Sequence, residues 1–111
     1  MKSYALTLNL RDDPVVIDEY VRYHAAVWPE VEAGLKSVGV TSMKIYLLGR
    51  RLFMYMEAVD SFEPLRDFQR YMNSKRAQEW DALMRTFQEK VPEAGPGEWW
   101  ASMRQVYDLK S

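Results

Sequence analysis

The residues best suited to chemistry lie in a short stretch around the single histidine of the chain. His24 follows Tyr20 by four residues and precedes Trp28 by four. On a helix, Tyr20 and His24 would project from one face, because residues four apart are neighbours there. A histidine titrates near neutral pH, and a phenol can donate a hydrogen bond or relay a proton. The set suits proton transfer on a small polar ligand, although spacing alone slightly favours a histidine that only packs in the core.

Tryptophans supply a second group of candidates. Trp80, Trp99 and Trp100 could form a platform for a sugar, because the C–H face of a pyranose stacks on indole and the ring N–H reaches hydroxyl groups. Aromatic residues at such spacings are more often core residues, and only one of Trp99 and Trp100 can face a given side of a strand. Glu57 stands out among the acidic residues because it lies inside a predicted strand.

Composition excludes several classes of function. The chain of 111 residues has no cysteine and one histidine, which excludes thiolate sites and disulfides and makes a metal site improbable. Its five glycines form no nucleotide-binding pattern, so we expect no cofactor. A net charge of −1 gives no reason to expect a nucleic acid or an anionic membrane as partner. With neither a secretory apolar segment nor a membrane span in the sequence, we expect a cytoplasmic protein.

The elements that must position these residues follow from hydrophobic spacing. Residues 3–10 alternate as a strand does, and Asp13 before Pro14 predicts the start of a helix that carries His24 on its apolar side. Pro29 should break this helix, and Gly39 should end its continuation. Alternation returns from Thr41 to Glu57, interrupted by Gly49-Arg50, which predicts a β-hairpin.

The second half of the chain repeats helix and strand. A helical region should begin at about Pro64, with Leu65, Phe68 and Met72 on one face, and Ser74 should cap a further helix that carries Trp80. Residues 92–97 form a loop, and 99–107 have the aromatic and β-branched content of a final strand.

The element order β-α-β-β-α-β predicts an α+β fold, a ferredoxin-like sandwich in a single domain spanning residues 1–111. Helices can cover only one face of the sheet, yet its second and third strands carry apolar side chains on both sides, as at Ile45 and Tyr46. We therefore expect a second sheet against the open face. A homodimer of this kind would be a dimeric α+β barrel.

The segment from Tyr20 to Val31 resembles the Y-x-x-x-H-x-x-x-W-P-E-[LV] signature of L-rhamnose mutarotases. Similarity continues through the hairpin and Trp80 to the closing Gln105-Val106-Tyr107, and so covers nearly the whole chain. The resemblance implies a cofactor-free dimeric α+β barrel that acts on the anomeric centre of a 6-deoxy-L-hexose.

Carried across by position, the resemblance makes His24 the catalytic histidine, with Tyr20 as its partner in proton transfer and as a sugar contact. Trp80 becomes a stacking wall. Trp28, four residues after His24, is expected from its spacing to flank the site near the break at Pro29. The sequence departs from the family pattern at Met43, where an aromatic residue is usual, and at Glu79, where the family has a second tryptophan beside Trp80. Both positions belong to the implied sugar pocket. The substrate, L-rhamnose or L-fucose, therefore stays open.

The implied reaction opens and closes the sugar ring by acid–base catalysis, which needs two proton-handling groups. Two alternatives remain on sequence grounds. Cofactor-free monooxygenases and haem-degrading proteins share the barrel and often one histidine with tryptophans, and a sugar-binding protein could have the same pocket without turnover.

Overall fold

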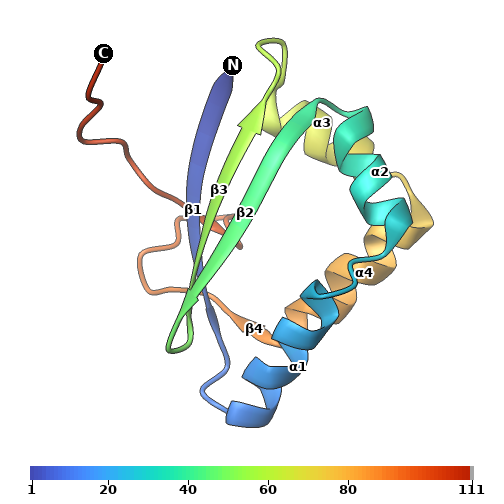
Figure 1. Cartoon of the computed structure of the whole chain (residues 1–111), viewed down its shortest axis with the longest axis vertical. Helices are drawn as coiled ribbons and strands as arrows, with labels where there is room; N and C mark the ends of the chain where they lie inside the picture. Colours follow the sequence, from blue (N-terminus) through green and yellow to red (C-terminus); the bar gives the residue numbers. More distant parts are fainter. Residues whose placement is uncertain (111) are drawn as a thin grey trace.

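The computed structural model describes residues 1–110 as two layers, an antiparallel sheet and four helices that lie along one of its faces (Figure 1). In chain order the elements are β1 (Lys2–Leu10), α1 (Pro14–His24), α2 (Pro29–Ser37), β2 (Val40–Leu48), β3 (Arg51–Ala58), α3 (Pro64–Tyr71), α4 (Lys75–Arg85), β4 (Gln88–Glu89) and β5 (Ala101–Ser102). The sheet runs β2-β3-β1-β4, and β5 also pairs with β1. This is the ferredoxin-like strand order, so the predicted fold class is confirmed.

The core lies between the helices and the side of the sheet that faces them. β1 and β3 pair in antiparallel register, with Leu8 opposite Leu52 and Tyr4 opposite Met56. Leu8, Leu52 and Met56 are almost completely buried. Because strand side chains alternate between faces, the period-2 pattern of the sequence places this apolar set toward the helices.

The first two helices begin where the sequence predicts, but α1 ends at His24, earlier than the break predicted at Pro29. The Asp13 carboxylate caps α1 by accepting a hydrogen bond from the Val15 backbone N–H at 2.9 Å. Trp28, which precedes Pro29, has the extended ψ of 130° that a following proline favours, so the chain breaks between α1 and α2. Gly39 follows α2 with a φ of 107°, a conformation that suits glycine.

The third helix differs from its prediction. Leu65 is 92% exposed and does not share a buried face with Phe68 and Met72, so that part of the prediction is wrong. The buried residue of the first turn of α3 is Asp67, which is 1% exposed.

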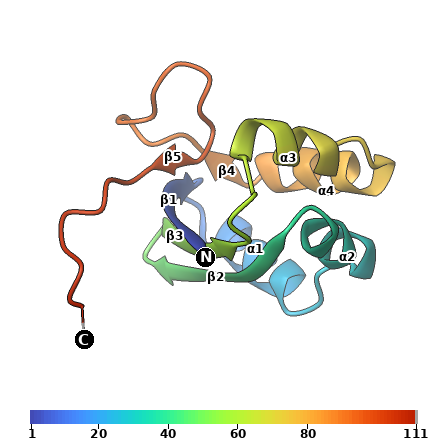
Figure 2. The ribbon, with the colours of Figure 1, turned by 90° about the horizontal axis from the view of Figure 1, so that it is seen from above.

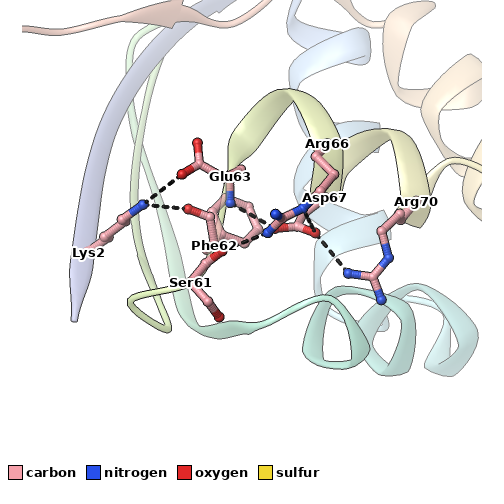
Figure 3. Close-up of polar contacts among 7 residues, drawn as sticks. All are labelled: Lys2, Ser61, Phe62, Glu63, Arg66, Asp67 and Arg70. Carbon is pink, nitrogen blue, oxygen red and sulfur yellow. Dashed lines mark hydrogen bonds and ion pairs between the residues drawn. The ribbon is translucent and has the colours of Figure 1, made fainter.

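Asp67 is buried because hydrogen-bond donors surround its carboxylate (Figure 3). It accepts from the guanidinium groups of Arg66 at 2.9 Å and Arg70 at 2.8 Å, and from the Glu63 backbone N–H at 2.8 Å. The Arg66 guanidinium, the Glu63 N–H and the Arg70 guanidinium together hold the pKa of this carboxyl well below its usual range. The next prediction, Ser74 as the cap of α4, is confirmed.

A final strand does lie within the predicted range 99–107, but it is only two residues long. Only Ala101–Ser102 pair with β1, opposite Thr7 and Leu6, while the unpredicted strand Gln88–Glu89 pairs with the end of β1. The Glu98 carboxylate, which accepts the backbone N–H groups of Gly95 and Ser102, holds the chain in a tight loop just before β5. Residues 103–110 are exposed and lead away from the helices (Figures 1 and 2).

The face of the sheet opposite the helices is uncovered by the chain itself (Figure 1). On it, Tyr46 stacks on Phe53 with ring centroids 6.1 Å apart and is 56% exposed, and Leu48 is 85% exposed. The expectation of helices on one face only is confirmed, and the second copy against the other face stays a prediction. Within residues 1–110, none of the helices has the length and apolar character needed to cross a membrane.

Candidate active site

A cavity of about 440 Å³ lies between the helices and the helix-facing side of the sheet. This volume falls within the range of small-molecule sites. Its walls are largely apolar and come from the three long strands and from all four helices. The polar side chains among its lining are Tyr20, His24, Tyr71, Asp81, Arg85 and Gln88.

Tyr20 and His24 meet inside this cavity, as their spacing predicts. Their rings lie with centroids 4.2 Å apart, inclined by 32°, in the last turn of α1. His24 Nδ1 lies 2.9 Å from the backbone carbonyl oxygen of Tyr20. Because a carbonyl oxygen can only accept, Nδ1 must carry the proton and donate. In the neutral ring, Nε2 is therefore the nitrogen with the free lone pair.

Burial perturbs both groups, in opposite directions. It lowers the pKa of His24, and the hydrogen bond to the Tyr20 carbonyl opposes this only in part. The C-terminal end of a helix normally favours the charged imidazolium form, but at His24 the effect of desolvation is larger, so His24 is neutral at pH 7. Burial also raises the pKa of Tyr20 to about 12, against a smaller lowering by a hydrogen bond from the Gln88 side chain. The site thus presents a neutral base beside a neutral phenol.

Aromatic rings and thioethers form the walls around this pair. Trp80, buried in α4, presents its ring to His24 at 5.6 Å in an edge-on arrangement. Met43 in β2 lines the cavity, and so does Trp100 in the loop before β5. Of the two adjacent tryptophans that the sequence could not separate, Trp100 is the one that faces the cavity.

Two other predicted contacts lie outside the lining. Trp28 packs edge-on against Trp80, with ring centroids 5.0 Å apart, and the Arg76 guanidinium lies 3.8 Å above its ring. Glu79 is exposed and forms an ion pair with Arg76 at 3.5 Å. Trp28 therefore supports the Trp80 ring, and Glu79 pairs with the arginine that lies over Trp28. Glu57 is not among the cavity residues either.

Sequence reasoning missed most of the polar lining. Tyr20 and His24 stand out in the sequence, whereas the other polar lining residues do not: Tyr71, Asp81, Arg85 and Gln88. Asp81 and Arg85 form an ion pair at 2.9 Å one helical turn apart. Gln88 offered a signal, since it continues the buried stripe of Trp80 and Met84 at intervals of four residues. Among residues 1–110, no three His, Asp or Glu side chains come close enough together to hold a metal ion.

Comparison with known proteins agrees with this geometry. Residues 3–109 match the family described as L-rhamnose mutarotase. The chain belongs to this family. The resemblance found in the sequence, around Tyr20, His24 and Trp28, is therefore confirmed. Family members are isomerases that act on sugar anomers, and a histidine and a tyrosine in an apolar cavity are groups suited to that chemistry.

Relatives of this mutarotase-family chain extend along its full length. A UPF0734 protein of Dictyostelium discoideum is 52% identical over 112 residues, which cover 97% of this chain and 90% of that protein. The L-fucose mutarotase of Xanthomonas campestris is 35% identical over 111 residues, 98% of this chain and 89% of the enzyme. The crystal structure of an L-rhamnose mutarotase from Formosa agariphila superposes with a TM-score of 0.72 at 19% identity, over 99% of this chain and all of that one. That structure supports the fold.

Proposed function

We propose that this mutarotase-family protein interconverts the α and β anomers of a 6-deoxy-L-hexose, with L-fucose as the preferred substrate. The observation that carries the proposal is the protonation pattern of the cavity. His24 donates through Nδ1 to the Tyr20 carbonyl, which leaves Nε2 as a base beside the un-ionised Tyr20 phenol. Base and acid therefore stand side by side, as the reaction requires.

In the proposed mechanism, His24 Nε2 removes the proton from the anomeric hydroxyl and the Tyr20 hydroxyl protonates the ring oxygen. The bond between C1 and the ring oxygen breaks, and an aldehyde forms. After rotation about the C1–C2 bond, the same steps in reverse close the ring on the other carbonyl face and return both protons. Acid–base catalysis of this kind contributes about 10²–10⁴-fold. The two side chains supply all the proton transfers, so the proposal includes no cofactor.

The cavity walls fit a deoxy sugar. Trp80 and Trp100 offer indole surfaces against which the C–H face of a pyranose can stack. Met43, Ile45 and Met54 line the opposite wall on the sheet. A methyl group at C6 is well accommodated by such a wall, whereas a hydroxymethyl group would lose hydrogen bonds to water there.

Two observations favour L-fucose over L-rhamnose. The full-length relative from Xanthomonas campestris is an L-fucose mutarotase. Met43 and Glu79 depart from the rhamnose-type pattern, and Met43 lines the cavity.

The function can be tested by proton NMR saturation transfer between the α and β anomeric resonances of L-fucose, L-rhamnose and D-glucose. We expect protein-dependent exchange that is fastest for L-fucose and weak for D-glucose. Faster exchange of L-rhamnose would correct the substrate, and absence of acceleration for both deoxy sugars would refute the proposed activity. Line broadening by binding without exchange would identify a sugar-binding protein instead.

A homodimer across the open face of the sheet, in a cytoplasmic setting, completes the proposal. Tyr46 and Leu48 lie on that face, and the exposed tail adds Val106, Tyr107 and Leu109 as apolar surface. Exposed apolar side chains grouped in this way are typical of a protein–protein interface. In sedimentation experiments Leu48→Glu should dissociate the dimer, whereas Leu65→Glu, an equally exposed leucine on the helical side, should not. A monomeric wild-type protein would contradict the dimer.

A further inference from the structure

Gln88 is a buried polar residue of the cavity to which the proposed mechanism gives no role. It is 6% exposed, begins β4 just after α4, and lines the cavity together with Tyr20 and His24. A buried amide needs hydrogen-bond partners for its oxygen and for its nitrogen, because leaving either without one costs stability. The partners of Gln88 therefore indicate what it does.

The oxygen of the amide is engaged by Trp99. The Trp99 indole Nε1–H donates to Gln88 Oε1 at 2.7 Å. An indole N–H can only donate, so its partner must be the amide oxygen. This fixes the orientation of the Gln88 amide, whose oxygen and nitrogen are otherwise hard to tell apart. With Oε1 toward Trp99, the planar amide directs its NH2 group away from that ring.

The amide NH2 group has Tyr20 as a polar neighbour, because Tyr20 and Gln88 line the same cavity. The Gln88 side chain opposes the rise in the pKa of Tyr20 that burial causes, as a donor to the phenol oxygen does. A phenol oxygen that accepts a hydrogen bond keeps its own proton free to donate elsewhere. The Tyr20 O–H is then available to an oxygen atom inside the cavity.

We propose that Trp99 and Gln88 form a hydrogen-bond relay that turns the Tyr20 hydroxyl toward the ring oxygen of the bound sugar. The inference rests on the proposed function and deepens it, because it explains how a buried tyrosine becomes the proton donor of the reaction. Gln88 acts through Tyr20 and is a positioning residue. Trp99, which does not line the cavity, is the outer end of the relay.

Charged side chains hold the outer end of the relay in place. The Arg85 guanidinium lies 4.6 Å from the centre of the Trp99 ring, and the Lys90 ammonium lies 5.8 Å from it. Cations over an indole face are attracted by its π electrons. The loop has a separate anchor, since the Glu98 carboxylate binds the backbone N–H groups of Gly95 and Ser102. The Trp99–Gln88 bond is therefore not needed merely to close the loop.

A double-mutant cycle on the full chain tests the relay. Gln88→Met keeps the length of the side chain and removes the amide, and we expect a loss of about 10-fold in kcat for anomer exchange, the order of one hydrogen bond, with little change in KM. If Gln88 acts through Tyr20, the same substitution in a Tyr20→Phe background should cost less than about twofold. Gln69→Met, the same change at an exposed position of α3, is the matched control and should leave exchange unchanged.

The alternatives predict different outcomes. Equal losses from Gln88→Met in both backgrounds would show that Gln88 acts independently of Tyr20 and would overturn the relay, as would wild-type exchange in Gln88→Met. Trp99→Phe keeps an aromatic ring and removes the N–H donor. It should show the same dependence on Tyr20, which provides a second route should Gln88→Met fail to fold.

A spectroscopic readout separates failure of the relay from failure of the proposed function. The Tyr20 ring resonances, assigned by their loss in Tyr20→Phe, should shift in Gln88→Met and in Trp99→Phe without any substrate. If wild-type protein catalyses no exchange but these resonances shift, the proposed function fails and the hydrogen-bond relay stands as a structural feature. If wild-type protein catalyses exchange and the resonances do not move, the relay is refuted and the function remains.

Discussion

Replacement of His24 by alanine is the most direct probe of the proposed chemistry. The substitution removes the base, so catalysed anomer exchange should fall by about 10²–10⁴-fold. It also removes two ring contacts, to Tyr20 at 4.2 Å and to Trp80 at 5.6 Å. Aromatic pairs contribute about 0.5–1.5 kcal/mol each beyond the area they bury, so the loss of these two contacts should cost about 1–3 kcal/mol. That is smaller than the ~5–15 kcal/mol typical of a domain, and His24→Ala should therefore remain folded.

The matched control is Tyr23→Ala in the same helical turn. Tyr23 also contacts Trp80, with ring centroids 6.2 Å apart, and Phe87 at 5.7 Å, but it does not line the cavity. Both variants should lose similar amounts of stability in thermal unfolding, whereas only His24→Ala should lose exchange in the NMR assay. Near wild-type exchange by folded His24→Ala, or equal loss in both variants, would refute the assignment of His24 as the base.

Three further predictions concern the pKa of His24, the buried charge of Asp67 and the cavity wall at Met43. Because burial lowers the pKa of His24, the rate of anomer exchange should stay constant from pH 8 down to about 6.5, the ordinary pKa of histidine, and should fall only below that pH. A rate profile measured by NMR with its midpoint above about pH 6.5 would contradict this. Asp67→Asn should lower Tm by several degrees at pH 7. Since the folded-state pKa of Asp67 is depressed, the difference in Tm between wild type and variant, measured by calorimetry, should become smaller as the pH falls below about 4. Met43→Tyr should raise the ratio of L-rhamnose to L-fucose exchange severalfold, and an unchanged ratio would exclude this position as a determinant of substrate.

Most of the fold could be predicted from the sequence because its signals are local. Asp13-Pro14 starts α1, Pro29 starts α2, and Gly39 ends the helical region, each for a reason contained in one or two residues. The strand pattern is equally local, since alternation alone tells which side chains of β1 and β3 face the helices. Tyr20 and His24 meet because both lie on one helix, so their contact needed no knowledge of tertiary structure.

What could not be predicted depends on contacts between distant segments. The pairing of Trp99 with Gln88 joins a loop to a strand that periodicity did not identify. Leu65 fits the apolar spacing of α3 but is exposed, whereas the Asp67 carboxylate is buried because three donor groups converge on it. The last predicted strand pairs with β1 only at Ala101 and Ser102, followed by one backbone hydrogen bond from the Met103 N–H to the Ala5 carbonyl.

A single property of the cavity gives its two central residues their different chemical roles. Desolvation disfavours whichever form is charged, so it lowers the pKa of His24 and raises that of Tyr20. The same apolar walls thus keep the histidine in its neutral form, which can accept a proton, and the tyrosine in its neutral form, which can donate one, at neutral pH. The remaining difficulty for a tyrosine with a pKa of about 12 is to release its proton, and a neutral hydrogen-bond donor at its oxygen eases this without adding a charge to the cavity. An amide such as Gln88 meets that requirement, whereas a lysine or arginine at the same place would also raise the energy of imidazolium at His24 and so weaken the base.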